Sequence, residues 1–148
     1  MSKLITSQKE VIFRIESEEY AISVLEVVSI ERSQQITAVP KQNKYLLGVI
    51  DLRGNIIPIV DLKKVLTGNE AILTDSTRLI IVQVDTQVIG FVVDAATDII
   101  DIPSSAIQKP SLFQSAFIYG IAKLEERMII LLDIPYLVDN VIGDLRIS

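Results

Sequence analysis

The chain has 148 residues, of which 49% are hydrophobic, and it carries a net charge of −5 with no His and no Cys. This length suits one domain with a real core. Without His or Cys, catalysis by a histidine base or a thiol nucleophile is excluded, as is a metal site built on either residue. The negative charge argues against nucleic-acid binding, which needs clustered Lys and Arg.

Ile and Val far outnumber the aromatic residues, and β-branched side chains favour strands. We therefore expect an all-β or β-rich fold. The apolar runs are much shorter than the roughly 20 residues that cross a bilayer, so no membrane insertion is expected. The N-terminal MSKLITSQKEV does not resemble a secretory signal, and a cytoplasmic location is expected. No phosphate-binding glycine motif is present, and no cofactor is predicted.

The first half of the chain predicts a hairpin, a buried strand and a short helix. Residues 11–15 (VIFRI) and 20–24 (YAISV) flank the charged turn ESEE, which is typical of a β-hairpin. Residues 56–60 (IIPIV) form a continuous apolar run. The following DLKKVL begins at Asp61, a good N-cap residue, and should end near Gly68.

The second half predicts the same elements in the same order. Residues 78–84 (RLIIVQV) and 88–93 (VIGFVV) flank the turn DTQ, and residues 128–132 (MIILL) form another apolar run. A helix should begin after Asp133 and end before Gly143. We interpret both aspartates as caps rather than as an acid–base pair.

The two halves align without gaps over two long segments. Residues 11–30 match residues 80–99, and residues 48–66 match residues 120–138. Turns fall on turns in both alignments. The chain is therefore predicted to contain an internal structural repeat.

Each repeat has enough short strands to curl into a small five-stranded barrel that hides its edges. We place the two β-barrel subdomains at about 11–70 and 78–138, intertwined within one domain at 8–140. Neither half is large enough to be very stable alone, so we expect the subdomains to share a hydrophobic core. Residues 1–7 and 141–148 are predicted to be flexible termini, and the chain is expected to be a monomer.

The repeats differ at one polar corner. Arg53-Gly54 aligns with Glu125-Glu126, and only the first pair contains Gly, which adopts positive φ readily and permits a close neighbour. An exposed arginine in an ordinary hairpin turn is one interpretation, and a partner-binding arginine is the other. The residues alone leave both open.

Longer motifs connect this corner to a known family. The segment GVIDLRGNIIPIVDL resembles the signature G-V-I-N-L-R-G-x-I-I-P-V-I-D-L of the CheW-like adaptors. EEYAISVLEVVSIE, Val39-Pro40 and GFVVDAATDII resemble three further family motifs. The resemblance covers about residues 11–137, and we expect a stand-alone adaptor of this family, without an attached kinase core or receiver domain.

The resemblance implies two SH3-like β-barrels packed around a shared core and a role without catalysis. Proteins of this family couple the cytoplasmic tip of methyl-accepting chemoreceptors to the regulatory domain of the histidine kinase CheA. The residues that match the family's partner-binding positions are Arg53, Gly54, Gly48, Val27, Gly90 and Gly120.

Two positions depart from the family pattern. Asp51 replaces the usual Asn before Leu-Arg-Gly, where its carboxylate could hold or compete for the Arg53 guanidinium. Ser29 stands where Glu is common, and Glu31 is a possible substitute. These departures keep open an adaptor for a paralogous pathway, such as pili or surface sensing.

Two alternatives come from other functional classes. One is an enzyme that uses carboxylates, around Asp75, Asp85 and Asp94. The other is a β-barrel that binds a small molecule in an apolar lumen. Neither alternative explains why Arg53 interrupts the internal repeat.

Overall fold

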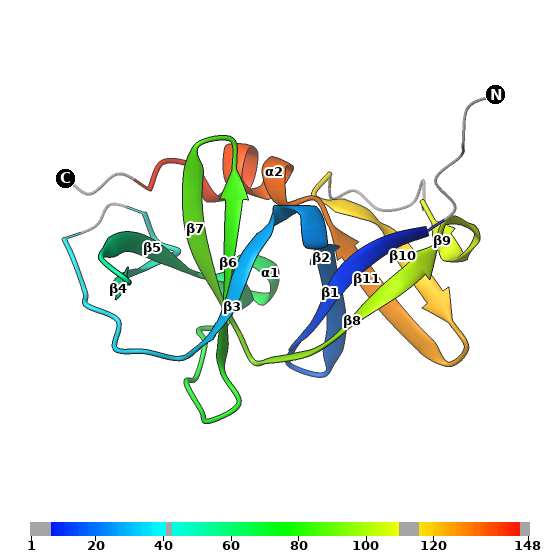
Figure 1. Ribbon diagram of the computed structural model, residues 1–148, viewed down its shortest axis with the longest axis horizontal. Helices are drawn as coiled ribbons and strands as arrows, with labels where there is room; N and C mark the ends of the chain where they lie inside the picture. The colour runs from blue at the N-terminus through cyan, green and yellow to red at the C-terminus, as the bar shows by residue number, and fades with distance from the viewer. Residues whose placement is uncertain (1–6, 41–42, 110–115, 146–148) are drawn as a thin grey trace.

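The computed structural model describes residues 7–40, 43–109 and 116–145, and its strands form two sheets (Figure 1). The six-stranded sheet has the order β8-β1-β2-β11-β10-β9, and the five-stranded sheet has the order β3-β6-β7-β5-β4. The six-stranded sheet contains β1 (Ser7–Ile15), β2 (Glu18–Ser23), β8 (Ala95–Pro103), β9 (Ile107–Gln108), β10 (Ile118–Leu124) and β11 (Arg127–Leu132). The five-stranded sheet contains β3 (Val27–Arg32), β4 (Leu46–Leu52), β5 (Asn55–Asp61), β6 (Arg78–Val84) and β7 (Gln87–Val93).

Both sheets curl until their edge strands meet. In the six-stranded sheet, the edge strands β8 and β9 are joined directly by the 3-10 turn η2 (Ser104–Ala106). In the five-stranded sheet, Thr37, which follows the edge strand β3, exchanges two backbone hydrogen bonds of 2.8 and 2.9 Å with Val49 on the other edge strand, β4. The predicted β-rich fold with two barrel-like subdomains is confirmed, but one sheet has six strands instead of the predicted five, because the short strand β9 adds to its edge.

The two barrels do not coincide with residues 11–70 and 78–138, because the repeats exchange their first hairpins. The β1–β2 hairpin joins the second half of the chain through a parallel pairing of β2 with β11. The β6–β7 hairpin joins the first half through the equivalent pairing of β5 with β7. The exchange places one hairpin of each repeat in the other repeat's barrel.

Alternation along the strands divides the buried side chains among three cores. Val11, Phe13 and Ile15 of β1 face a core shared by the two barrels, whereas Ile12 faces the interior of the six-stranded barrel. This is the two-residue period of a strand buried on both faces. Side chains fill each barrel interior. The six-stranded barrel contains Ile129 and Leu131, and the five-stranded barrel contains Ile59 and Ile81.

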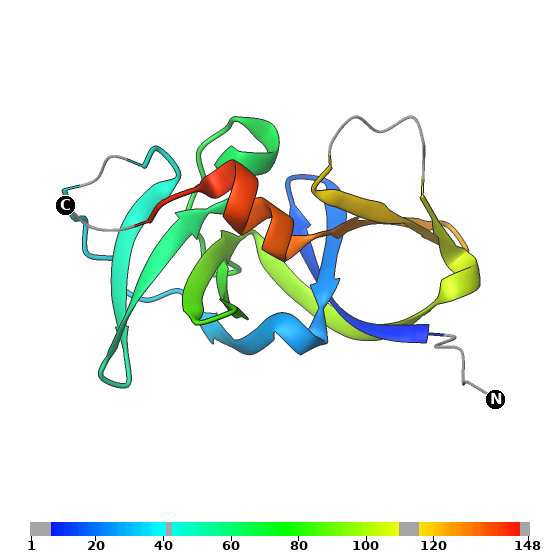
Figure 2. The same ribbon diagram turned by 90° about the horizontal axis from the view of Figure 1, so that it is seen from above.

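A helical segment lies across the junction of the barrels (Figure 2). It consists of α2 (Ile134–Tyr136) and the π-helical η3 (Leu137–Ile142), and its apolar side chains enter the shared core. Leu145, beyond the helix, is also buried there. The predicted flexible termini lie outside the described residues at 1–6 and 146–148, whereas 141–145 belongs to this packed segment.

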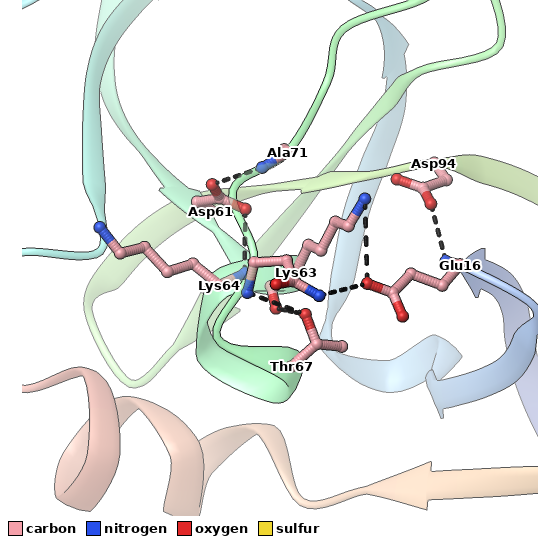
Figure 3. Close-up of polar contacts among 8 residues, drawn as sticks. Glu16, Asp61, Lys63, Lys64, Thr67, Ala71 and Asp94 are labelled. Atoms are coloured by element: carbon pink, nitrogen blue, oxygen red, sulfur yellow. Dashed lines mark hydrogen bonds and ion pairs between the residues drawn. The ribbon is translucent and has the colours of Figure 1, made fainter.

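Both predicted N-caps are confirmed, and they differ in burial. Asp61 precedes α1 (Leu62–Thr67), is 1% exposed, and accepts hydrogen bonds from the backbone N–H of Lys64 at 3.1 Å and of Ala71 at 2.9 Å. Asp133 accepts one bond, from the N–H of Tyr136 at 3.0 Å. Asp61 therefore holds both its helix and the loop that follows (Figure 3).

Polar contacts connect α1 of the five-stranded barrel to the β1–β2 turn of the other barrel (Figure 3). The Glu16 carboxylate accepts a hydrogen bond from Asn69 at 2.9 Å and lies 4.0 Å from the Lys63 ammonium. The Glu16 backbone N–H donates to Asp94 at 2.7 Å. These contacts are largely exposed, so they orient the barrels more than they stabilise them.

Glu10 is a buried carboxylate in the interior of the six-stranded barrel. It is 2% exposed, and the equivalent residue of the other barrel is Leu79. Burial, together with the nearby Glu26 carboxylate, raises the pKa of Glu10 to about 7, against a smaller opposing effect of a 3.2 Å hydrogen bond from Gln8. A group with this pKa destabilises the fold when it ionises.

We predict that Asp61→Ala lowers the free energy of unfolding by about 2–3 kcal/mol, because two backbone N–H groups lose their acceptor at a buried site. Asp133→Ala removes one bond at a more open site and should cost about 1 kcal/mol. Urea unfolding of both variants measures the difference. Equal losses would contradict the dual role of Asp61.

We also predict that Glu10→Gln stabilises the protein above pH 7 and has little effect near pH 4.5. The folded protein retains the Glu10 proton up to about pH 7, whereas the unfolded chain releases it near pH 4.5, so wild-type stability falls between these values. The difference between the two proteins should reach roughly 3 kcal/mol. Unfolding curves from pH 4 to 8 test this, and a difference that does not change with pH would contradict it.

Candidate partner-binding surface

Arg53 occupies the first central position of the two-residue β4–β5 turn. Its φ is 52° and that of Gly54 is 89°, as a type I′ hairpin turn requires. The guanidinium extends from an exposed side chain and lies 3.6 Å from the Glu31 carboxylate on β3. The hairpin projects beyond the five-stranded barrel (Figure 2). Arg53 is therefore accessible to a partner.

Asp51 does not compete for the guanidinium in this arrangement. One of its carboxylate oxygens accepts a hydrogen bond from the Gly54 backbone N–H at 2.8 Å. This contact closes the turn that presents Arg53. Glu31, rather than Asp51, supplies the charge partner, with a separation that is long for a strong ion pair.

The positive-φ backbone conformation of Arg53 recurs in the other tight hairpins. Glu16, Asp85 and Glu125 occupy the corresponding position of the other three hairpins, with φ between 53° and 57°. A non-glycine residue in this region carries backbone strain of about 1 kcal/mol. The repeat therefore supplies the turn shape, and what distinguishes Arg53 is its side chain.

A surface pocket of about 670 Å³ lies beside Arg53. Its walls include Val28 and Ile56, which are 56% and 62% exposed, and its floor includes Ile57 and Ile81 from the barrel interior. Exposed apolar side chains around a pocket are a common mark of a protein-binding site.

The other predicted site residues do not themselves line this pocket. Val27 packs against the shared core. A methyl group on Gly48 would come within 2.2 Å of the Thr37 carbonyl oxygen, at the point where the barrel closes, and one on Gly90 would meet Ile59 at 2.5 Å. Gly120 lies close to the backbone of Gln108. Each of these glycines has a packing reason to be present, and their role in partner binding stays a prediction.

Sequence patterns did not identify Val28 and Ile56, two exposed residues that line the pocket. Residues 56–60 were interpreted as one buried run, but Ile56 and Ile57 are adjacent on a strand and so face opposite sides. Ile57 is 5% exposed and Ile56 is 62% exposed. Alternation alone does not reveal this exposure, because Val60 lies on the same face of the strand as Ile56 and is fully buried.

The alternative functions find little support. Asp85 forms a hairpin turn and Asp94 accepts a backbone hydrogen bond, so both have structural roles. The barrel interiors are filled by side chains. Among the described residues, no group of three or more acidic side chains is arranged to hold a metal ion, and no helix is long and apolar enough to cross a membrane.

Comparisons with known proteins agree with the architecture. Chemotaxis protein CheW of Bacillus subtilis is 38% identical over 139 residues, covering 91% of this chain and 89% of the relative. Chemotaxis protein CheW of Klebsiella aerogenes is 31% identical, covering 90% and 82%. The crystal structure of the scaffolding protein TtCheW from Thermoanaerobacter tengcongensis superposes with a TM-score of 0.85 at 30% identity, covering 96% of this chain and 99% of that one.

The family model described as the CheW-like domain matches residues 9–141, nearly the whole chain. Together with the two β-barrel sheets and the Leu-Arg-Gly turn, this match shows that the chain belongs to the CheW-like domain family.

Proposed function

We propose that this protein is a cytoplasmic, non-enzymatic adaptor that holds the histidine kinase CheA against the tips of methyl-accepting chemoreceptors in chemotaxis signalling. The relatives named as chemotaxis proteins support the pathway. The accessible Arg53 beside an apolar pocket is the observation that carries the proposal. An adaptor needs stiff docking surfaces, and this site provides an apolar area next to the planar, charged guanidinium of Arg53.

The physical task of Arg53 is to anchor the edge of an interface. Its planar guanidinium can bind a carboxylate or backbone carbonyls on a coiled-coil tip. The Glu31 contact is 3.6 Å long and the arginine side chain is 73% exposed, so releasing it costs little. Arg53 can therefore exchange Glu31 for a partner group.

We predict that Arg53→Asn weakens binding to a chemoreceptor tip fragment by about 1–3 kcal/mol. Asn is well suited to a left-handed turn position before Gly, so the fold should be retained or slightly stabilised. Calorimetric titration with the receptor fragment and with the CheA regulatory domain measures both affinities. The matched control is Glu125→Asn, which makes the same change at the equivalent turn and should leave receptor binding unchanged.

A folded Arg53→Asn protein with wild-type receptor affinity would reject the role of Arg53. A wild-type protein that binds neither the receptor fragment nor the kinase domain would reject the adaptor function itself.

A further inference from the structure

A polar cavity of about 250 Å³ lies between strands of the six-stranded barrel, the 3-10 turn η1 (Val24–Glu26) and the start of α2. Three carboxylates from three different elements line it: Glu10 of β1, Glu26 of η1 and Asp133 ahead of α2. Within the described part of the chain, none of the three forms an ion pair with Lys or Arg. The negative charge around this cavity is therefore not neutralised by a neighbouring cation among those residues.

The five-stranded barrel has only one carboxylate at the equivalent positions. The pairs of equivalent residues are Glu10 and Leu79, Glu26 and Ala95, and Asp133 and Asp61. Leu79 is fully buried, and Asp61 accepts two backbone hydrogen bonds within its own barrel. The barrel architecture therefore does not require Glu10 or Glu26, and the cluster of three is particular to the six-stranded barrel.

Burial and mutual repulsion both oppose ionisation of this cluster. Glu10 is 2% exposed, and its burial, followed by the Glu26 carboxylate, raises its pKa to about 7. Burial and then the Asp133 carboxylate raise the pKa of Glu26. The three groups are therefore coupled, and near pH 7 the proton on Glu10 decides whether the cavity carries its full negative charge.

The other groups that face Glu10 are uncharged. Gln8 donates a hydrogen bond of 3.2 Å to its carboxylate. The remaining neighbours are Ser23 on β2 and Ile100 on β8, which lie opposite Glu10 in the sheet, and the cavity residues Tyr119, Leu131, Leu132 and Pro135. Lys9, the next residue on β1, pairs with Asp101 at 3.6 Å, and the Lys109 ammonium lies 4.9 Å from the ring centre of Tyr119.

The turn η1 can move at low cost. It carries the chain from β2 in one sheet to β3 in the other (Figure 1), none of its residues is buried, and Leu25 is 94% exposed. The α2 segment is better anchored, because Ile134 is buried in the shared core. Segments with few buried apolar contacts open more readily than packed ones. Repulsion across the cavity should therefore displace η1 rather than α2.

We propose that Glu10, Glu26 and Asp133 form a pH-sensitive switch, which holds η1 against the six-stranded barrel while Glu10 is protonated and releases it when Glu10 ionises. Protonation removes one negative charge and gives the cluster an O–H donor, whereas ionisation removes the donor and adds repulsion. Because η1 joins the two barrels, its release loosens one of the connections between them. The switch is a property of the fold and does not depend on the proposed adaptor function.

Amide hydrogen exchange measures the opening of η1 directly. The reporter is the Val27 N–H, which donates to the Val24 carbonyl at the end of η1. The control is the Ile107 N–H, which donates to the Ser104 carbonyl at the end of η2 in the same barrel. After correction for the intrinsic exchange rate at each pH, opening at Val27 should increase about tenfold or more between pH 5 and pH 7.5, because the closed state retains the Glu10 proton to higher pH than the open state. Opening at Ile107 should change much less.

Three variants assign the effect to the cluster. Glu10→Gln should keep Val27 protected and remove the pH dependence of its opening. Glu26→Gln removes the repelling carboxylate from η1 and should reduce that dependence. The matched control is Glu18→Gln, at an exposed position of β2, which should behave as the wild-type protein does. An NMR titration of the Glu10 carboxyl carbon should give a pKa of about 7.

Each outcome decides for or against the switch. Opening at Val27 that does not change with pH, or an unchanged pH dependence in Glu10→Gln, would overturn it. An equal change at Ile107, or an opening free energy at Val27 equal to that of global unfolding in urea, would show that the whole fold loosens and would reject a local switch. Loss of the pH dependence in Glu10→Gln, with its retention in Glu18→Gln, would support it.

Discussion

The rest of the structure depends on the apolar core that the two barrels share. Phe13 and Ile15 from one exchanged hairpin and Phe91 and Val93 from the other are all buried in it. Because each hairpin is paired into the opposite repeat's barrel, neither repeat can fold with its own strands alone. The shared core therefore makes two small barrels into one cooperative unit, in keeping with the limited stability of domains this small.

This arrangement leaves the outer ends of the barrels free to differ. The strands that form the shared core are constrained on both faces, whereas the turns and outer corners face solvent. At one corner, the six-stranded barrel has the ion-pair network of Arg127, Glu19 and Asp98, and the five-stranded barrel has an open apolar pocket. The same backbone thus supports a corner closed by ion pairs in one repeat and an open pocket in the other.

The Leu-Arg-Gly corner combines a conformational requirement with a chemical one. All four tight hairpins place a non-glycine residue at positive φ, so the turn shape follows from the twist of the paired strands. Asp51 stabilises the turn by accepting the Gly54 N–H. The arginine is then presented by the scaffold with its guanidinium free to exchange partners, which suits an adaptor that assembles with others.

Much of the fold could be predicted from local patterns. The hairpins, the caps at Asp61 and Asp133 and the helix ends near Gly68 and Gly143 follow from alternation and from short-range hydrogen-bonding chemistry. The internal repeat was visible because equivalent positions carry similar side chains. Arg53 was nominated by its break with the repeat and by the family signature, and the structure places it beside the pocket.

The sequence by itself determined the β-rich class, the repeated order of elements, the capped helices and the arginine turn, because each depends on neighbouring residues in the chain. Only the tertiary structure decided the hairpin exchange, the pairing of Arg53 with Glu31 and the exposure of Ile56. These depend on which distant strands become neighbours. An apolar strand can pair equally well with either repeat on local grounds, and the choice is made by the shared core that the complete chain buries.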